Sequence, residues 1–129
     1  MTATFVLDGT RIRTLEDFWQ VLMDAFDGTG RLYFGRNLNA FADCLSGGPG
    51  HPEVDQYIVE WRDHAVSREH LGYPETVRQL ELRLSKCHPT NRPAVSADLA
   101  AAREERGTTV FDWLIEIFQD RAPGALRLR

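Results

Sequence analysis

The chain of 129 residues contains little cysteine and no long hydrophobic run. Its two cysteines, Cys44 and Cys87, are too few for a disulfide scaffold and lack the Cys-x-x-Cys spacing of a metal site. No stretch approaches the roughly 20 consecutive apolar residues that cross a bilayer. The N-terminus has neither the basic region nor the apolar core of a signal peptide. We therefore expect a cytoplasmic protein that binds no metal ion and no membrane.

Basic residues are also few, since 15 Lys and Arg stand against 19 Asp and Glu and give a net charge of −4. A nucleic-acid-binding surface needs basic clusters that displace the counterions of phosphate groups, so we expect no nucleic-acid partner. An acidic protein can instead attract a basic partner. Apolar residues make up 43% and charged residues 26%, as is typical of a globular domain, and the length fits a single domain, residues 1–129.

The motifs of common catalytic sites are missing as well. There is no Gly-rich phosphate loop and no nucleophile elbow. The four histidines lie in polar segments and are His51, His64, His70 and His88. Asp63 precedes His64, but neighbours in sequence do not supply the tertiary partner that a catalytic histidine needs. We therefore expect no catalytic residue and no cofactor, and a hydrolase using Asp63, His64 and Asp120 is the least favoured function.

Hydrophobic periodicity predicts three strands and several helices. The strands are expected at 4–7, 56–61 and 125–129, with 10–12 as a continuation of the first strand. Helices are expected from Thr14, after Asn37, over 75–86, from Ala97 behind a Ser96 cap, and from Thr109. Because helices separate the strands, the order predicts an α/β fold with a small parallel sheet. The nearly continuous apolar run of 56–61 predicts a central strand that is covered on both faces.

Two helices carry recognisable starts and apolar faces. Thr14 with Asp17, and Thr109 with Asp112, are variants of the capping box. The helix after Thr14 is expected to bury Leu15, Phe18, Trp19, Leu22, Met23 and Phe26. The last helix is expected to be deeply buried, with a narrow polar stripe of Asp112, Glu116, Gln119 and Asp120.

The most informative stretch is 33–48, which reads YFGRNLNAFADCLSGG. Asn37 is a good N-cap, and Gly47 and Gly48 suit the end of the helix. Helical spacing puts Leu38, Phe41 and Leu45 on one face, with Cys44 beside them. Asn39, Asp43 and Ser46 share the opposite face, flanked by Ala42. Asp43 lies in the last turn, where the helix dipole disfavours a carboxylate, and such departures from local rules are typical of functional sites.

This stretch resembles the barstar family, which consists of small inhibitors of the ribonuclease barnase. Residues 5–12, 58–62, 118–120 and 125–129 are similar to other elements of that family, in the same order along the chain. The resemblance implies a three-stranded parallel sheet with about four to five helices. It does not cover 67–107, which we expect to form an enlarged helical insertion.

The resemblance also implies a function and a set of partner-binding residues. These residues are Tyr33, Asn37, Asn39, Ala42, Asp43, Ser46, Gly47 and Asp120. They would block the active site of a basic ribonuclease or related nuclease toxin, because a fixed carboxylate can take the place of the substrate phosphate. Asn39 and Ala42 stand where the best-known member has an aspartate and a tryptophan. An interaction module with a different partner therefore remains the alternative, and in either case we expect a monomer in the free state.

Overall fold

The computed structural model describes residues 2–26, 36–47 and 56–129. Three parallel strands form one sheet in the order β1 (Thr2–Asp8), β2 (Gln56–Arg62) and β3 (Leu126–Leu128). The helices are α1 (Leu15–Phe26), α2 (Leu38–Leu45), α3 (His64–His70), α4 (Tyr73–Lys86), α5 (Arg92–Arg103) and α6 (Val110–Arg121). The predicted α/β class with a three-stranded parallel sheet is confirmed. The described residues form six α-helices, where four to five were expected.

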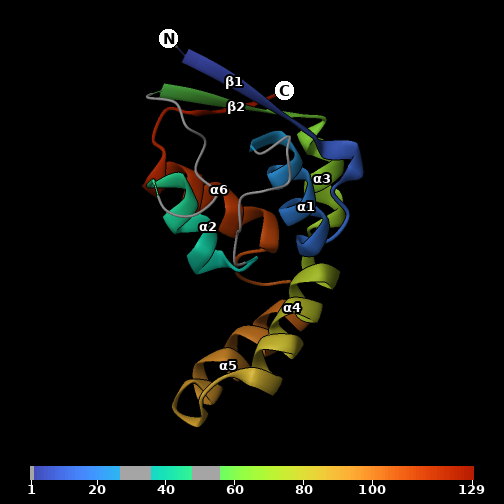
Figure 1. Cartoon of the computed structure of the whole chain (residues 1–129). Helices are drawn as coiled ribbons and strands as arrows, with labels where there is room; N and C mark the ends of the chain where they lie inside the picture. Colours follow the sequence, from blue (N-terminus) through green and yellow to red (C-terminus); the bar gives the residue numbers. More distant parts are fainter. Residues whose placement is uncertain (1, 27–35, 48–55) are drawn as a thin grey trace.

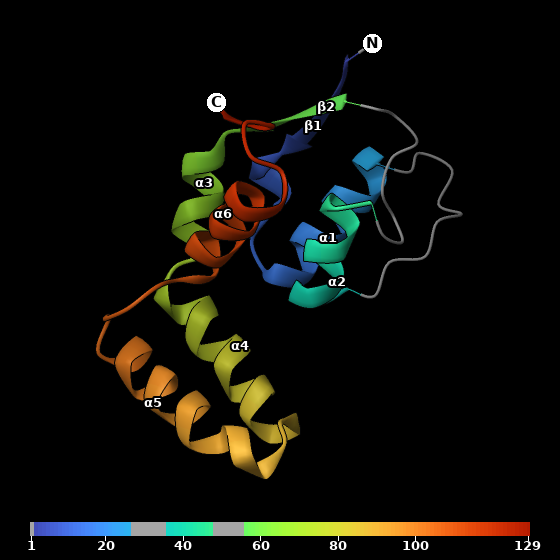
Figure 2. The ribbon, with the colours of Figure 1, turned by 90° about the vertical axis from the view of Figure 1, so that its left-hand side faces the viewer.

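The helices form two groups (Figures 1 and 2). Helices α1, α2, α3 and α6 lie under one face of the sheet, and α4 and α5 form a hairpin that extends away from it. The hairpin has an apolar cluster of its own, made by Leu80, Val95, Leu99 and Ala102. Trp113 of α6 packs against this cluster and against the main core, so it joins the hairpin to the body.

One face of the sheet is covered and the other is not. Val59 of β2 pairs with Phe5 and Leu126 on the side of the helices, where Val59 is fully buried. The neighbouring row, Val6–Glu60–Arg127, points to the opposite side, and Val6 is 39% exposed. None of the helices in the described ranges lies over that side (Figure 1). The prediction that β2 is covered on both faces is therefore wrong, because an apolar run alone does not show where the helices pack.

Four aromatic rings at the centre of the core fix the positions of α1, α2 and α6 under β2. Phe18 lies 5.3 Å, between ring centroids, from both Phe41 and Trp61, and Phe41 lies 5.1 Å from Phe118. All four side chains are fully buried. The Phe18–Phe41 and Phe41–Phe118 pairs are edge-to-face, and such pairs add to the free energy gained by burying the rings. The Phe41 side chain points into this cluster and holds α2 rigidly against the core.

The chain turns sharply after β1 instead of continuing as a strand. The Asp8 carboxylate accepts hydrogen bonds from the Thr10 backbone N–H (3.0 Å) and hydroxyl (2.6 Å), and Gly9–Arg11 form a 3-10 turn. The expected strand at 10–12 is therefore wrong. Gly9 is buried under Ser67, whose hydroxyl donates to the Gly9 carbonyl at 2.8 Å and accepts from the Trp61 indole at 2.9 Å.

The helix starts show where local signals suffice and where they fail. The capping box of α6 is present, and Thr14 and Asp17 exchange the same pair of hydrogen bonds at the start of α1. The expected cap at Ser96 is wrong, because α5 already begins at Arg92. Pro93 stands in the first turn of α5, where its missing N–H leaves no hydrogen bond unmade. Ser96 is consequently an interior residue of the helix.

Glu75 of α4 ties the hairpin to the start of α1. Its side chain is 6% exposed and accepts hydrogen bonds from the Leu15 backbone N–H (2.8 Å), from Arg78 Nε (2.6 Å) and from Gln79 (3.0 Å). Desolvation raises the pKa of Glu75, but the hydrogen bonds from Arg78, Leu15 and Gln79 outweigh it and hold the pKa below the usual 4.5. The carboxylate is therefore a structural group that must stay ionised.

We expect Glu75→Gln to lower the free energy of unfolding by about 2 kcal/mol at pH 7, because the buried carboxylate loses the charge that strengthens its hydrogen bonds from Leu15, Arg78 and Gln79. A lowered folded-state pKa stabilises the fold at pH values above the unfolded-state pKa, and this stabilisation is lost as the pH falls through the folded-state pKa. The difference between variant and wild type should therefore shrink below pH 4.5. Urea denaturation of both proteins at pH 7 and pH 3 measures this difference in unfolding free energy. Glu81→Gln, which removes only an exposed pair with Arg103, is the control, and an equal loss in both variants would contradict this role.

Candidate functional site

Helix α2 begins and ends where the sequence predicts. Asn37 is the N-cap, and its side-chain oxygen accepts from the Ala40 backbone N–H at 2.8 Å. At the other end, the Ser46 backbone N–H bonds to the carbonyl oxygens of Ala42 (3.2 Å) and Asp43 (3.1 Å). Gly47 has a φ of +109°, a conformation that favours glycine at a helix end. Gly48 lies outside the described residues.

The two faces of α2 differ in exposure as the helical spacing predicts. Phe41, Cys44 and Leu45 are buried against the core, and Leu38 is partly buried. Burial raises the pKa of the Cys44 thiol to about 12, so Cys44 acts as a small apolar residue. The exposed residues are Asn39, Asp43 and Ser46, with Ala42 partly buried beside them.

Asp43 is the only charged residue of α2. Its carboxylate makes no hydrogen bond or ion pair with another residue in the described part of the chain. It lies in the last turn, so the helix dipole adds to the negative potential around it. The core holds the helix in place and the carboxylate faces outward. The geometry suits an incoming cation.

Asp120 lies near Leu38, at the start of α2, because α6 packs against α2. It lines a hollow of about 500 Å³ together with Leu38 of α2, Arg83 of α4 and, from α6 itself, Trp113, Glu116 and Ile117. Asp120 also pairs with Arg121 at 3.1 Å, but both side chains are exposed, so the pair is weak. Ile117 is only partly buried, so α6 is less buried than the sequence predicted.

The structure describes seven of the eight predicted contact residues. Asn37, Asn39, Ala42, Asp43, Ser46 and Gly47 lie on or beside α2, and Tyr33 lies outside the described residues. Glu116 is not among the predicted site residues, although it lies one turn before Asp120 in the same hollow. The spacing of four residues on the polar stripe of α6 was the signal that could have identified it.

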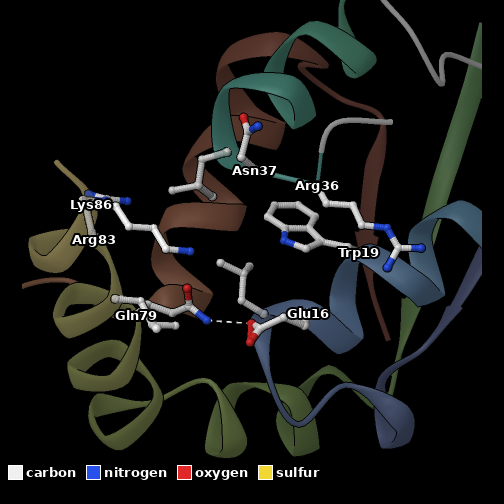
Figure 3. A pocket seen from close by; sticks show the side chains of 10 residues that line it. Glu16, Trp19, Arg36, Asn37, Gln79, Arg83 and Lys86 are labelled. Atoms are coloured by element: carbon white, nitrogen blue, oxygen red, sulfur yellow. Dashed lines mark hydrogen bonds between the residues drawn. The ribbon is translucent and has the colours of Figure 1, made fainter. Parts of the chain in front are cut away.

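A second hollow, of about 390 Å³, opens at the start of α2 (Figure 3). Arg83 and Lys86 of α4 lie on one side of it, and Arg36 and Trp19 lie on the other. Arg36 directly precedes the Asn37 cap and donates to the Gln20 side chain at 3.1 Å. The sequence analysis missed these basic residues as a group, because only tertiary packing brings α4 beside the start of α2.

The contacts of His64 are structural. Its Nδ1 lies 2.8 Å from the Arg129 carbonyl oxygen, and its ring stacks on Phe111. No hydrogen bond or ion pair within the described ranges joins His64 to Asp63 or Asp120. The same ranges contain no group of three or more His, Cys, Asp or Glu side chains arranged to hold a metal ion. Among them, too, no helix has the length and apolar character to span a membrane.

The N-cap of α2 can be tested apart from partner binding. We expect Asn37→Ala to lower the free energy of unfolding by about 1 kcal/mol, because a backbone N–H of the first turn loses its acceptor. Asn39→Ala, on the exposed face two residues later, is the matched control and should change it by less than about 0.5 kcal/mol. Urea denaturation of both variants measures the difference. Equal values would show that the cap contributes nothing.

Comparison with known proteins gives one finding on the family. A protein-family model described as Barstar (barnase inhibitor) matches residues 2–88. The match runs from β1 through α4 and includes α2, and it ends before α5, α6 and β3. It therefore supports the resemblance of the 33–48 stretch, reaches further into 67–107 than that resemblance did, and leaves Asp120 outside. No curated protein matches the chain.

Proposed function

The chain belongs to the barstar (barnase inhibitor) family, and from this premise we propose that it binds and blocks a ribonuclease or a related nuclease toxin. The observation that carries the proposal is the outward carboxylate of Asp43, which has no hydrogen-bond or ion-pair partner among the described residues and lies on a rigidly packed helix inside the matched region. The proposed contact residues are Tyr33, Asn37, Asn39, Ala42, Asp43, Ser46, Gly47 and Asp120. The protein would act as an inhibitor with no catalysis of its own, in the cytoplasm of the cell that it protects.

The proposed mechanism is substitution for the substrate. A nuclease must hold a phosphate group with cationic side chains, and in the free enzyme these face water. A carboxylate placed among them satisfies the same charges without offering a bond to cleave. Docking also removes water from the pair, which strengthens the attraction between the opposite charges. Because α2 is already ordered by Phe41 and its caps, little conformational freedom is lost on binding.

The two departures from the family pattern bear on the choice of partner. Asn39 offers hydrogen bonds where the best-known member offers a charge, and Ala42 presents a methyl group in place of a large aromatic anchor. Aromatic anchors in interfaces often contribute a large share of the binding energy. The α2 face is therefore flatter and depends more on Asp43. We propose that the cognate nuclease differs from barnase in the part of its cleft that faces Ala42.

An inhibition titration tests the proposal. Increasing amounts of the chain are added to barnase, to other basic microbial ribonucleases and to the nuclease toxins of the same source, and the remaining nuclease activity is measured. We expect loss of activity at a one-to-one ratio for at least one nuclease. Unchanged activity of the whole panel, with the chain correctly folded, would contradict the proposal. That result would favour the alternative, an interaction module that retains the fold, for which Asn39 and Ala42 are the supporting observations.

A further inference from the structure

The two hollows adjoin each other at Leu38 and Arg83, and together they are called the groove. The 390 Å³ hollow and the 500 Å³ hollow share two lining residues, Leu38 of α2 and Arg83 of α4. One hollow extends toward Glu16 and Trp19, and the other toward Asp120. The groove therefore runs from Asn37 and Asp120, two of the proposed contact residues, onto α4. A partner protein that contacts the start of α2 would therefore also contact the α4–α5 hairpin.

The groove is basic where it is formed by α4. Arg83 and Lys86 lie on that side, and Arg36 faces them across the hollow (Figure 3). Lys86 makes no hydrogen bond or ion pair with any described residue. The nearby carboxylate of Glu16 is already bound by Arg78 (2.6 Å) and Gln79 (2.7 Å), so it does not neutralise the three cations. The acidic residues Glu116 and Asp120 lie at the opposite end of the groove.

The same part of α4 exposes an apolar side chain. Leu82 is 42% exposed and lines the hollow beside Arg83 and Lys86. The guanidinium of Arg83 is held 5.3 Å from the centre of the Trp113 ring, so its position is fixed. An exposed leucine next to cations that are partly ordered is the composition of a contact surface, with an apolar contact inside a polar border.

The exposed face of α2 is too small to form a stable interface alone. A stable interface uses about 20–30 residues on each partner, and the exposed residues of an eight-residue helix supply only a small part of that number. The interface must therefore continue onto neighbouring elements. Asn37, one of the proposed contact residues, lines the same hollow as Leu82, Arg83 and Lys86, so α4 lies next to the proposed contact surface.

We propose that the nuclease contacts α4 as well as α2, by placing an acidic patch with an apolar centre over Leu82, Arg83 and Lys86. The inference rests on the proposed function, since the occupant of the groove is the same nuclease that α2 blocks. The hairpin then selects the partner. A nuclease with carboxylates beside its cationic cleft is attracted at both ends of the groove, and a nuclease that is basic throughout is repelled by α4.

Two matched pairs of variants test the contact, with the nuclease that the wild-type chain inhibits most tightly as the probe. Lys86→Gln is compared with Arg127→Gln, which removes one charge from the sheet face opposite the helices. Leu82→Ser is compared with Val66→Ser, a similarly exposed residue (37%) on α3. We expect Lys86→Gln to slow association about fivefold at low salt and less at high salt, and Leu82→Ser to speed dissociation about fivefold. Both controls should stay within twofold.

The outcomes separate this inference from the proposed function. If Lys86→Gln and Leu82→Ser bind like their controls while Asp43→Ala binds weakly, the α4 contact is overturned and the inhibitor function stands. If the wild-type chain inhibits no nuclease of the panel, both are overturned. Thermal unfolding of each variant checks that the exposed substitutions leave the fold intact, so that a loss of binding reports on the contact itself.

Discussion

Asp43→Ala is expected to weaken nuclease binding by about 3 kcal/mol or more, which corresponds to a change in Kd of at least a hundredfold. The removed carboxylate would leave the cations of the nuclease buried and unpaired, and this penalty adds to the lost attraction. Stability should not fall, because the Asp43 side chain is exposed and makes no hydrogen bond or ion pair with other described residues. Removal of a negative charge from the last turn of α2 is even slightly favourable for the helix.

Titration calorimetry of the inhibited nuclease against wild type and variants measures this effect. Asp43→Asn separates the charge from the shape and should bind nearly as weakly as Asp43→Ala. Asp98→Ala removes an equally exposed aspartate from α5, away from the α2 face, and should bind within twofold of wild type. If Asp43→Ala and Asp98→Ala bound equally well, Asp43 would not be the residue that enters the nuclease active site.

Gly9→Ala is expected to cost about 3 kcal/mol of unfolding free energy, the largest loss of stability that we predict for one added methyl group. A Cβ atom at position 9 would lie 2.3 Å from the Arg62 carbonyl oxygen and 2.6 Å from that of Asp63. Both atoms belong to the backbone at the junction of β2 and α3, so the clash is relieved only if this junction moves away from Gly9. The shift would also break the hydrogen bond between Ser67 and the Gly9 carbonyl.

Urea denaturation of Gly9→Ala and Gly72→Ala tests this packing. At position 72 the nearest atom to an added Cβ is the Glu69 carbonyl oxygen at 3.3 Å, so only a small adjustment is needed. Gly72→Ala should change the free energy of unfolding by less than about 1 kcal/mol, since the crowding is offset by the lower entropy of the unfolded chain. Similar stabilities of the two variants would show that the chain can rearrange around Gly9.

The features that the sequence predicts correctly are those that depend on neighbours along the chain. The caps of α1, α2 and α6 are read from residues three apart, and the buried face of α2 follows from helical spacing alone. The alternation of Leu126 and Leu128 with Arg127 is local in the same way, and it identifies β3. These local predictions are correct because the tertiary packing does not override the local preferences.

The features that the sequence does not predict depend on contacts between distant segments. Nothing in the sequence near β2 shows that the helices of the described ranges lie on one side of the sheet. Glu75 looks like an ordinary acidic residue at a helix start, yet it is buried because Leu15, sixty residues earlier, donates to it. The placement of Asp120 beside Leu38 likewise needs the packing of α6 on α2.

The most direct test of the account is competition for the nuclease active site. The affinity of the chain for its nuclease is measured with and without a saturating, non-cleavable oligonucleotide substrate analogue. If the α2 face occupies the phosphate site, the analogue should raise the apparent Kd in proportion to its concentration, and Asp43→Ala should weaken the competition. An affinity that does not change with the analogue would contradict the central claim, because the chain would then bind outside the active site.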